Sequence, residues 1–151
     1  MAPASAAEDR LREEILSFTF YHVNRLSEAD MTQAHMQPQQ CHNNAAAYAA
    51  QDASGGSRAV SGWWKRDGIF LFHSVVLAQS RLFCVTPHPS SPSLEFAPDP
   101  RIEWHDSGSK RVARRNGQDV PDIVRLHPAE TREAARKARD LLLGGDGSFG
   151  K

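Results

Sequence analysis

The chain has 151 residues, of which 40% are hydrophobic and 24% are charged. This is the length of one domain with a single core, and the composition is ordinary for a soluble globular protein. Eighteen basic residues balance eighteen acidic ones, so the overall charge argues against a nucleic-acid-binding protein and against binding to an anionic membrane.

The first third of the chain predicts three helices. Residues 5–23 begin with a capping box and carry apolar residues at helical spacing. Residues 24–40 are polar and predict a second, short helix that ends before the proline at 38. Residues 41–53 are rich in alanine and predict a third helix, which the Ser-Gly-Gly-Ser sequence at 54–57 ends.

The composition then changes to short segments rich in β-branched and aromatic residues. Three of them predict an antiparallel meander: 58–66, 68–78 and 81–87. The proline-rich segment 87–100 predicts a loop. Residues 101–106 and 111–120 predict further strands, with Asn116 and Gly117 in a type I′ hairpin turn.

Residues 127–145 predict a closing helix, because alanine and leucine residues share one side of it and glycine follows. We therefore expect a single domain over residues 1–143 and a flexible tail over residues 144–151. Helices first, a central antiparallel sheet and a closing helix predict the α+β class.

The location of the protein is expected to be cytoplasmic. The longest apolar run, Ile69–Ala78, is far too short to cross a bilayer, and the N-terminal sequence lacks the basic start and apolar centre of a signal peptide. In a reducing compartment the two cysteines are expected to be free thiols. Secretion by a route without a cleavable signal is the alternative.

Cys41 is the residue that most strongly suggests chemistry, because it lies at the start of the predicted third helix. Unpaired amides and the helix dipole favour a negative charge there and lower the pKa of a thiol. A thiolate nucleophile needs a histidine to carry the proton, and His73, in an otherwise apolar strand, is the best candidate. The alternative interpretations are a small buried hydrophobe and a hydrogen-bonded core histidine.

Four segments of this region are QCHNNAAAYAA, SGWWKRDGIFLFHSVV, RLFCVTPHP and LEFAPDP. Together they resemble a group of small bacterial proteins with a Cys-His-x-Asn helix start, a Gly-Trp segment, a histidine-bearing strand, an Asp-x-Thr-Pro strand and a Phe-x-Pro-Asp loop. That group is similar to a minimal papain-like cysteine hydrolase. The resemblance covers roughly residues 40–100 and implies N-terminal helices, with a catalytic cysteine at a helix N-terminus, packed on an antiparallel sheet.

The resemblance makes Cys41 the nucleophile and His73 the base, and the acidic residue of the group falls on Cys84 here. The 11-residue step from His73 to Cys84 suits two neighbouring strands of a hairpin, so we expect their side chains to meet. A thiol replaces a carboxylate poorly, since it neither fixes an imidazole tautomer well nor stabilises an imidazolium. Other residues that match the motif are Asn44, Gly62, Trp63, Thr86 and Pro87. Alternative orienting residues for the base are His88, Asp99 and Asn44.

The expected activity is attack by the Cys41 thiolate on an amide carbon of a protein or peptide-like substrate, without a cofactor. Hydrolysis, deamidation and acyl transfer share this first half-reaction. The amides of the helix after residue 41, with Gln40, are expected to hold the oxyanion. Further residues expected at the oxyanion or substrate site are His42, Asn44 and Trp63.

The sequence also allows three other interpretations of these residues. The first is a non-catalytic binding module in which Cys84 marks the loss of the third catalytic residue. The second is a zinc site, since Cys41, His42, His73 and Cys84 supply two sulfurs and two imidazoles. The third is a reversible disulfide between the two cysteines.

A mildly basic stretch is the last feature of the sequence, and it contains Lys110, Arg111, Arg114 and Arg115. Such a stretch is ordinarily a solvated face, and a patch for an acidic partner is the alternative. The oligomeric state is left open.

Overall fold

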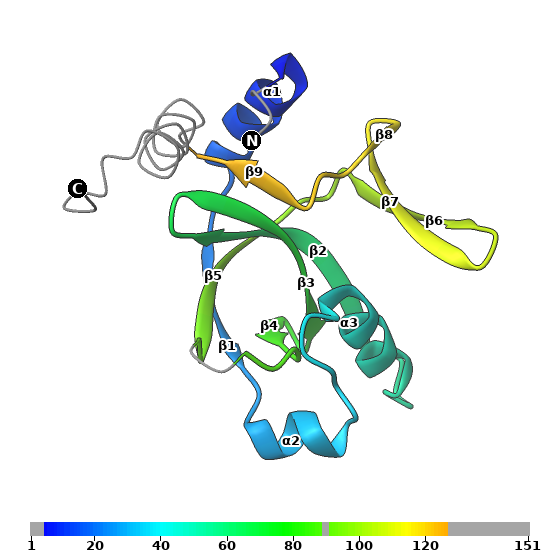
Figure 1. Cartoon of the computed structure of the whole chain (residues 1–151). Coiled ribbons are helices and arrows are strands. Elements are labelled where there is room, and N and C mark those ends of the chain that lie inside the picture. The colour runs from blue at the N-terminus through cyan, green and yellow to red at the C-terminus, as the bar shows by residue number, and fades with distance from the viewer. Residues whose placement is uncertain (1–4, 89–90, 127–151) are drawn as a thin grey trace, which may run out of the picture.

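The computed structural model describes residues 5–88 and 91–126 (Figure 1). The helices are α1 (Ala6–Leu16), α2 (Glu28–Gln33) and α3 (Cys41–Ala50). The strands are β1 (Tyr21–Arg25), β2 (Ser57–Arg66), β3 (Ile69–Ala78), β4 (Arg81–Cys84), β5 (Ser93–Pro98), β6 (Ile102–Ser107), β7 (Lys110–Arg115), β8 (Gln118–Asp119) and β9 (Ile123–Arg125). Among the described residues, strands account for 43% and helices for 22%.

Five strands form a closed barrel in the order β2-β5-β1-β4-β3, and β3 pairs with β2 to complete the ring. The pairings are antiparallel except that of β1 with β4, which is parallel. Strand β9 pairs with the first residues of β3, and β6, β7 and β8 form a separate sheet. Figure 1 shows this second sheet projecting from the ring, with α3 lying against the barrel.

The predicted papain-like α+β class is wrong, because the structure is mostly β and closes into a barrel instead of packing helices on an open sheet. The difference comes from two strands that the sequence did not predict. Residues Tyr21–Arg25, expected at the end of the first helix and the start of the next segment, form β1, and Ser93–Pro98, inside the expected loop, form β5. These two strands pair with each other and with β4 and β2, which closes the ring.

Several local predictions are confirmed. The second and third helices form, and so does the β2-β3-β4 meander. Asn116 and Gly117 have φ of 52° and 79°, as a type I′ turn requires. The predicted closing helix over residues 127–145 and the tail over 144–151 lie outside the described residues.

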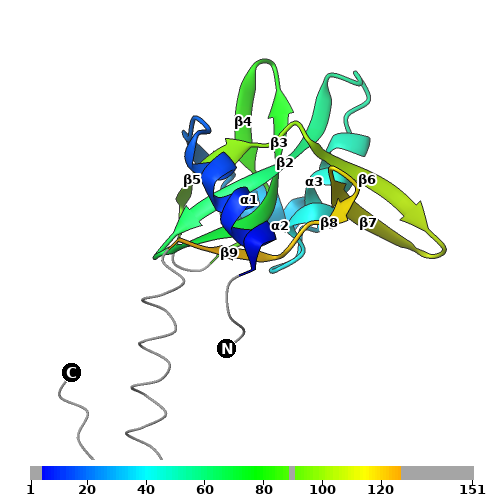
Figure 2. The ribbon, with the colours of Figure 1, turned by 90° about the horizontal axis from the view of Figure 1, so that it is seen from above.

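The apolar residues form three clusters. One fills the barrel: Val23, Trp64, Val75, Cys84, Leu94 and Phe96. A second joins α2 and α3 to the outside of the barrel: Met31, Met36, Ala45, Val76 and Val85. A third lies under α1: Ile15, Trp63, Phe70 and Val124. Figure 2, seen from above, shows α1 across one end of the barrel beside β9.

A buried carboxylate fixes the second sheet to the barrel. Asp99 follows β5, and its Oδ2 accepts hydrogen bonds from Nε1 of Trp63 at 3.0 Å and from Nε of Arg115 at 2.7 Å. Arg115 also donates to Glu14 of α1 at 2.9 Å. Asp99 therefore joins β2 and β7, and it acts here as a structural residue.

Candidate functional site

Cys41 is the first residue of α3, as predicted, and its side chain is half-buried. The first amides of a helix have no intrahelical partner, so they point toward the space around this residue. Gln40 precedes the helix and makes no capping bond to the backbone, since its side-chain oxygen accepts from Asn43 Nδ2 at 3.0 Å. The thiol and these amides therefore lie together at one end of α3.

The pKa of Cys41 is nevertheless raised above its ordinary value. Burial is the main cause, and the neighbouring Cys84 acts in the same direction. The backbone amides of Ser74, His42 and Cys41 itself act to lower the pKa. Desolvation thus outweighs the amides, and the net direction is opposite to the one expected from the helix terminus alone.

The side chain of His73 lies inside the barrel, where it contacts Trp64 and Phe96 and is only 4% exposed. Its Nε2 is 3.4 Å from Sγ of Cys84. The expected contact across the hairpin between these two positions is therefore present. Among the described residues, no hydrogen bond joins His73 to Cys41.

Arg25 completes this interior arrangement, and no pattern in the sequence pointed to it. Its Nη1 donates to Sγ of Cys84 at 2.8 Å and to the carbonyl of Thr86 at 2.9 Å. Cys84 thus lies between an imidazole and a guanidinium, in the place where a carboxylate would bind both. Arg25 stands on β1, the strand that the sequence did not predict, which explains why it was missed.

Burial controls the ionisation of these groups. It lowers the pKa of His73 to about 3, and the charges of Arg25, His42 and His88 act in the same direction. Burial also raises the pKa of Cys84, although Arg25 opposes this effect. At neutral pH, His73 is therefore a neutral imidazole and both cysteines are thiols.

Asn44 occupies a motif position, and its contacts explain why an amide is needed there. Its Nδ2 donates to the carbonyl of Gln37 at 2.7 Å and to Oγ1 of Thr86 at 3.0 Å, and its Oδ1 accepts from the Gln37 amide at 3.1 Å. The side chain thereby ties the loop before α3 to the end of β4. Asn44 is buried and positions the start of α3, and it does not line the groove beside Cys41.

Trp63 was expected near the substrate, but the structure places it elsewhere. It is fully buried under α1 and hydrogen-bonds to Asp99. The next residue, Trp64, packs inside the barrel, because successive residues of a strand point to opposite faces. Neither indole lines an open site beside Cys41.

His42 belongs to a second hydrogen-bonded chain on the outside of β3. Its Nδ1 is 2.6 Å from Oγ of Ser74, which is 2.8 Å from Oγ of Ser61, and Nε1 of Trp104 donates to Ser61 at 2.9 Å. Burial lowers the pKa of His42 to about 4. This chain joins the start of α3 to β2, β3 and β6.

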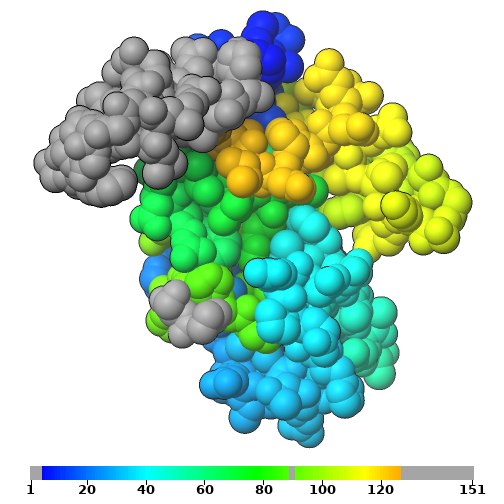
Figure 3. All heavy atoms as spheres, viewed as in Figure 1, coloured from blue at the N-terminus to red at the C-terminus, as the bar shows by residue number. Residues whose placement is uncertain are grey.

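A groove opens between the start of α3 and the hairpin of β6 and β7, with a volume of about 490 Å³. Gln40, Cys41 and His42 line it, whereas His73 and Cys84 do not. Figure 3 shows the hairpin projecting beside the chain around α3, with a hollow between them. A larger hollow of about 680 Å³ lies elsewhere, and none of the sequence-predicted site residues lines it.

The remaining sequence hypotheses concern metal binding and relatedness. Within the described part of the chain, no group of three or more histidine, cysteine, aspartate or glutamate residues is placed to hold a metal ion, and no helix is long and apolar enough to span a membrane.

No family model, curated protein or solved structure matches this chain. The case for a function therefore depends on the geometry around Cys41.

Proposed function

We propose that this protein is a cysteine-dependent amide hydrolase or acyl transferase, with Cys41 as nucleophile and His73 as base. The observation that carries the proposal is the position of Cys41. It begins a helix, lines an open groove, and lies beside the Ser74 amide of the strand that bears His73. We place the protein in the cytoplasm, acting on a peptide-like amide.

The reaction starts from a neutral pair. His73 accepts the thiol proton as the sulfur attacks the carbonyl carbon, and the first amides of α3 stabilise the oxyanion. His73 then gives the proton to the leaving amine, which leaves a thioester on Cys41. Water or a second amine attacks the thioester and releases the free thiol. Because His73 bonds to Cys84 in this structure, its ring must turn toward Cys41 or act through a bridging water.

A second candidate function is a binding module that uses the same groove without catalysis. The observation in its favour is the ionisation of the pair. Burial raises the pKa of Cys41 and lowers that of His73 to about 3, so both directions oppose a thiolate–imidazolium pair. Cys84 in place of a carboxylate leaves an imidazolium without a stabilising charge.

Labelling of Cys41 with iodoacetamide, followed by peptide mass across a pH series, separates the two functions. If His73 acts as a general base, labelling stays fast well below pH 8 although the resting group is a thiol, and it slows by about tenfold or more in His73→Ala. The reason is that, without the imidazole, no side chain accepts the proton of the buried thiol while the sulfur attacks the reagent.

The matched control is His22→Ala, which removes an exposed histidine of β1 that pairs with Glu95 at 3.2 Å. It should leave the labelling rate unchanged. The opposite result is slow labelling at neutral pH that follows an ordinary thiol titration and does not change in His73→Ala. It would contradict the proposed enzymatic function and favour the binding module.

Replacing Cys84 with aspartate tests the third position directly. The new carboxylate would lie between Arg25 and His73, and a nearby negative charge favours imidazolium. We expect the pKa of His73 to rise from about 3 by at least about two units, as measured by NMR titration of the imidazole. Cys41 labelling at neutral pH should rise with it.

Cys84→Asn is the control, because asparagine has the same shape as aspartate without the charge. If the two variants give the same His73 titration, Cys84 does not occupy an orienting position for the base.

A further inference from the structure

The wall of the groove opposite Cys41 is basic. Of the nine residues that line the groove, Lys110 and Arg111 are cations and none is a carboxylate. Both belong to the β6–β7 hairpin, whereas Cys41 stands at the start of α3. The groove therefore places positive charge across from the thiol.

Arg111 is held in place without an ion pair. Its guanidinium lies 4.7 Å from the ring centroid of Trp104, and that indole is anchored to Oγ of Ser61. Asp106 lies directly opposite Arg111 in the β6–β7 ladder, yet no ion pair joins them within the described part of the chain. The guanidinium is thus oriented by the indole face and keeps its hydrogen-bond donors for another group.

The charge of Arg111 reaches the groove. Burial is the main cause of the lowered pKa of His42, Asp122 opposes it, and Arg111 adds to it. His42 stands next to Cys41 in the groove lining. Asp122 acts more strongly on His42 than Arg111 does, but it does not line the groove, so an anion bound against the hairpin would interact with Arg111.

We propose that the groove selects substrates that carry a carboxylate beside the scissile amide, which makes acidic peptides the substrate class. Arg111 and Lys110 are the residues that determine this specificity. The catalytic part rests on the proposed function above, whereas the preference for anions rests on the groove alone. A planar guanidinium suits a carboxylate because it can donate two parallel hydrogen bonds.

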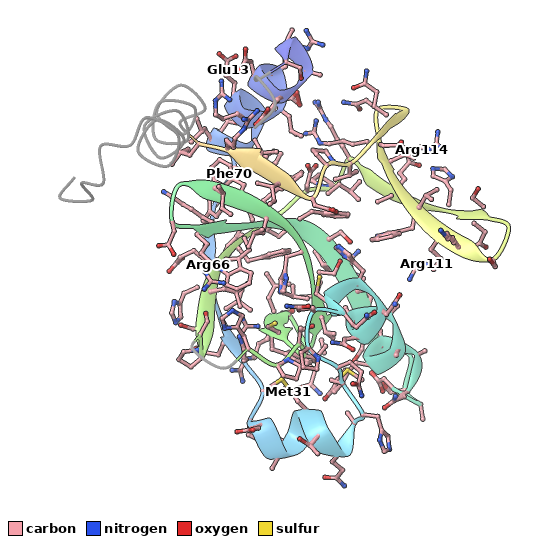
Figure 4. The ribbon with its side chains drawn as sticks, in the orientation of Figure 1. Glu13, Met31, Arg66, Phe70, Arg111 and Arg114 are labelled. Carbon is pink, nitrogen blue, oxygen red and sulfur yellow. The ribbon has the colours of Figure 1, made fainter. Side chains whose placement is uncertain are left out.

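The hairpin offers its own control. Arg114 stands on the same strand as Arg111, and Figure 4 shows the two on opposite sides of the hairpin. Arg114 does not line the groove and lies 3.4 Å from Asp119. Removing Arg114 changes the net charge of the hairpin by the same amount as removing Arg111.

The experiment compares alkylation of Cys41 by anionic iodoacetate and neutral iodoacetamide at low salt. The ratio of the two rates is normalised to that of free cysteine in the same buffer. We expect the normalised ratio to fall by about fivefold or more in Lys110→Ser/Arg111→Ser, and to fall similarly for the unmodified protein at about 0.5 M salt, because screening removes the attraction. Arg111→Lys should keep most of the ratio and Arg114→Ser nearly all of it.

Protection by peptides extends the test to the substrate class. A short glutamate peptide should protect Cys41 from iodoacetamide better than the matching glutamine peptide, and the difference should disappear in Lys110→Ser/Arg111→Ser. An unchanged rate ratio in that double variant, or an equal fall in Arg114→Ser, overturns the proposal. Equal protection by both peptides overturns it as well.

The two proposals fail separately. If iodoacetamide labelling does not depend on His73 while the ratio of iodoacetate to iodoacetamide rates still depends on Arg111, the enzymatic function is contradicted and the anion-selective groove is supported. If labelling depends on His73 but the rate ratio does not depend on Arg111, the enzymatic function is supported and the proposed substrate class is contradicted.

Discussion

Replacing Gly62 with alanine is expected to destabilise the protein by about 3 kcal/mol or more, because the barrel has no room for a side chain there. A Cβ at this position would lie 2.0 Å from the carbonyl oxygen of Ala97 and 2.9 Å from Cζ of Phe96. Gly62 pairs with His73 on one side and with Pro98 on the other, so a shift of β2 would disturb both neighbouring strands. Urea unfolding followed by tryptophan fluorescence measures the change.

The matched control is Gly68→Ala in the turn between β2 and β3. Gly68 has φ of +80°, and a Cβ at this position would have no atom within 4 Å, so alanine there costs only the left-handed backbone, about 1 kcal/mol. If Gly62→Ala costs no more than Gly68→Ala, the close approach to Ala97 does not explain the glycine. The glycine of the Gly-Trp motif would then need another reason.

Elements with a signal in their own residues were predicted from the sequence. The helix that starts at Cys41 has a run of alanines and a glycine-rich end, and the β7–β8 turn has Asn116 and Gly117 in the order that its geometry needs. The β2–β3–β4 meander also follows from local patterns, since its strands are adjacent in the chain. In each case the interactions that fix the structure join residues that are close in sequence.

Closure of the barrel could not be predicted in this way. Tyr21–Arg25 follows a helical pattern without a break, and it forms a strand because it pairs with β4 and β5. Its partner β5 is about 70 residues further along the chain and lies in a segment whose prolines argue against a strand. Tertiary pairing therefore overrode the local signals at both places.

In the candidate site too, features that depend on local sequence were predicted and features that depend on tertiary structure were not. Contact between His73 and Cys84 was expected from their spacing on two neighbouring strands, and it is present. Arg25 was missed because its strand was missed. The raised pKa of Cys41 was missed because a helix terminus can be read from the sequence, whereas the burial that outweighs it cannot.

Acid is expected to unfold this protein at a higher pH than its carboxylates alone would predict, because two histidines are buried in the neutral form. The pKa of His73 is lowered from 6.5 to about 3, and that of His42 from 6.5 to about 4, with burial as the main cause of both shifts. Arg25 and the other histidines add to the shift of His73, while Asp122 opposes that of His42.

The sign follows from which state binds the protons. Below the unfolded value of 6.5 the unfolded chain is protonated at both histidines, whereas the folded protein resists protonation down to about 3 and about 4. The unfolded state therefore binds more protons across this window, so stability falls as the pH falls from 6.5. Near pH 4.5 each histidine costs about 2 to 3 kcal/mol, and the pair costs about 5 kcal/mol, which matches the whole stability of many domains.

Urea unfolding at several pH values between about 7 and 4.5 tests this expectation. The window avoids most of the contribution of Glu8, whose lowered pKa, caused mainly by its hydrogen bond from Arg125, costs stability only below the unfolded value of 4.5. His73→Gln keeps a polar side chain without the titration, so its free energy of unfolding should depend on pH with a slope smaller by about one proton. His22→Ala, at an exposed site, should keep the slope of the unmodified protein. A slope that His73→Gln leaves unchanged would show that this imidazole takes up its proton equally well in the folded barrel, and would remove the basis for treating it as a neutral base.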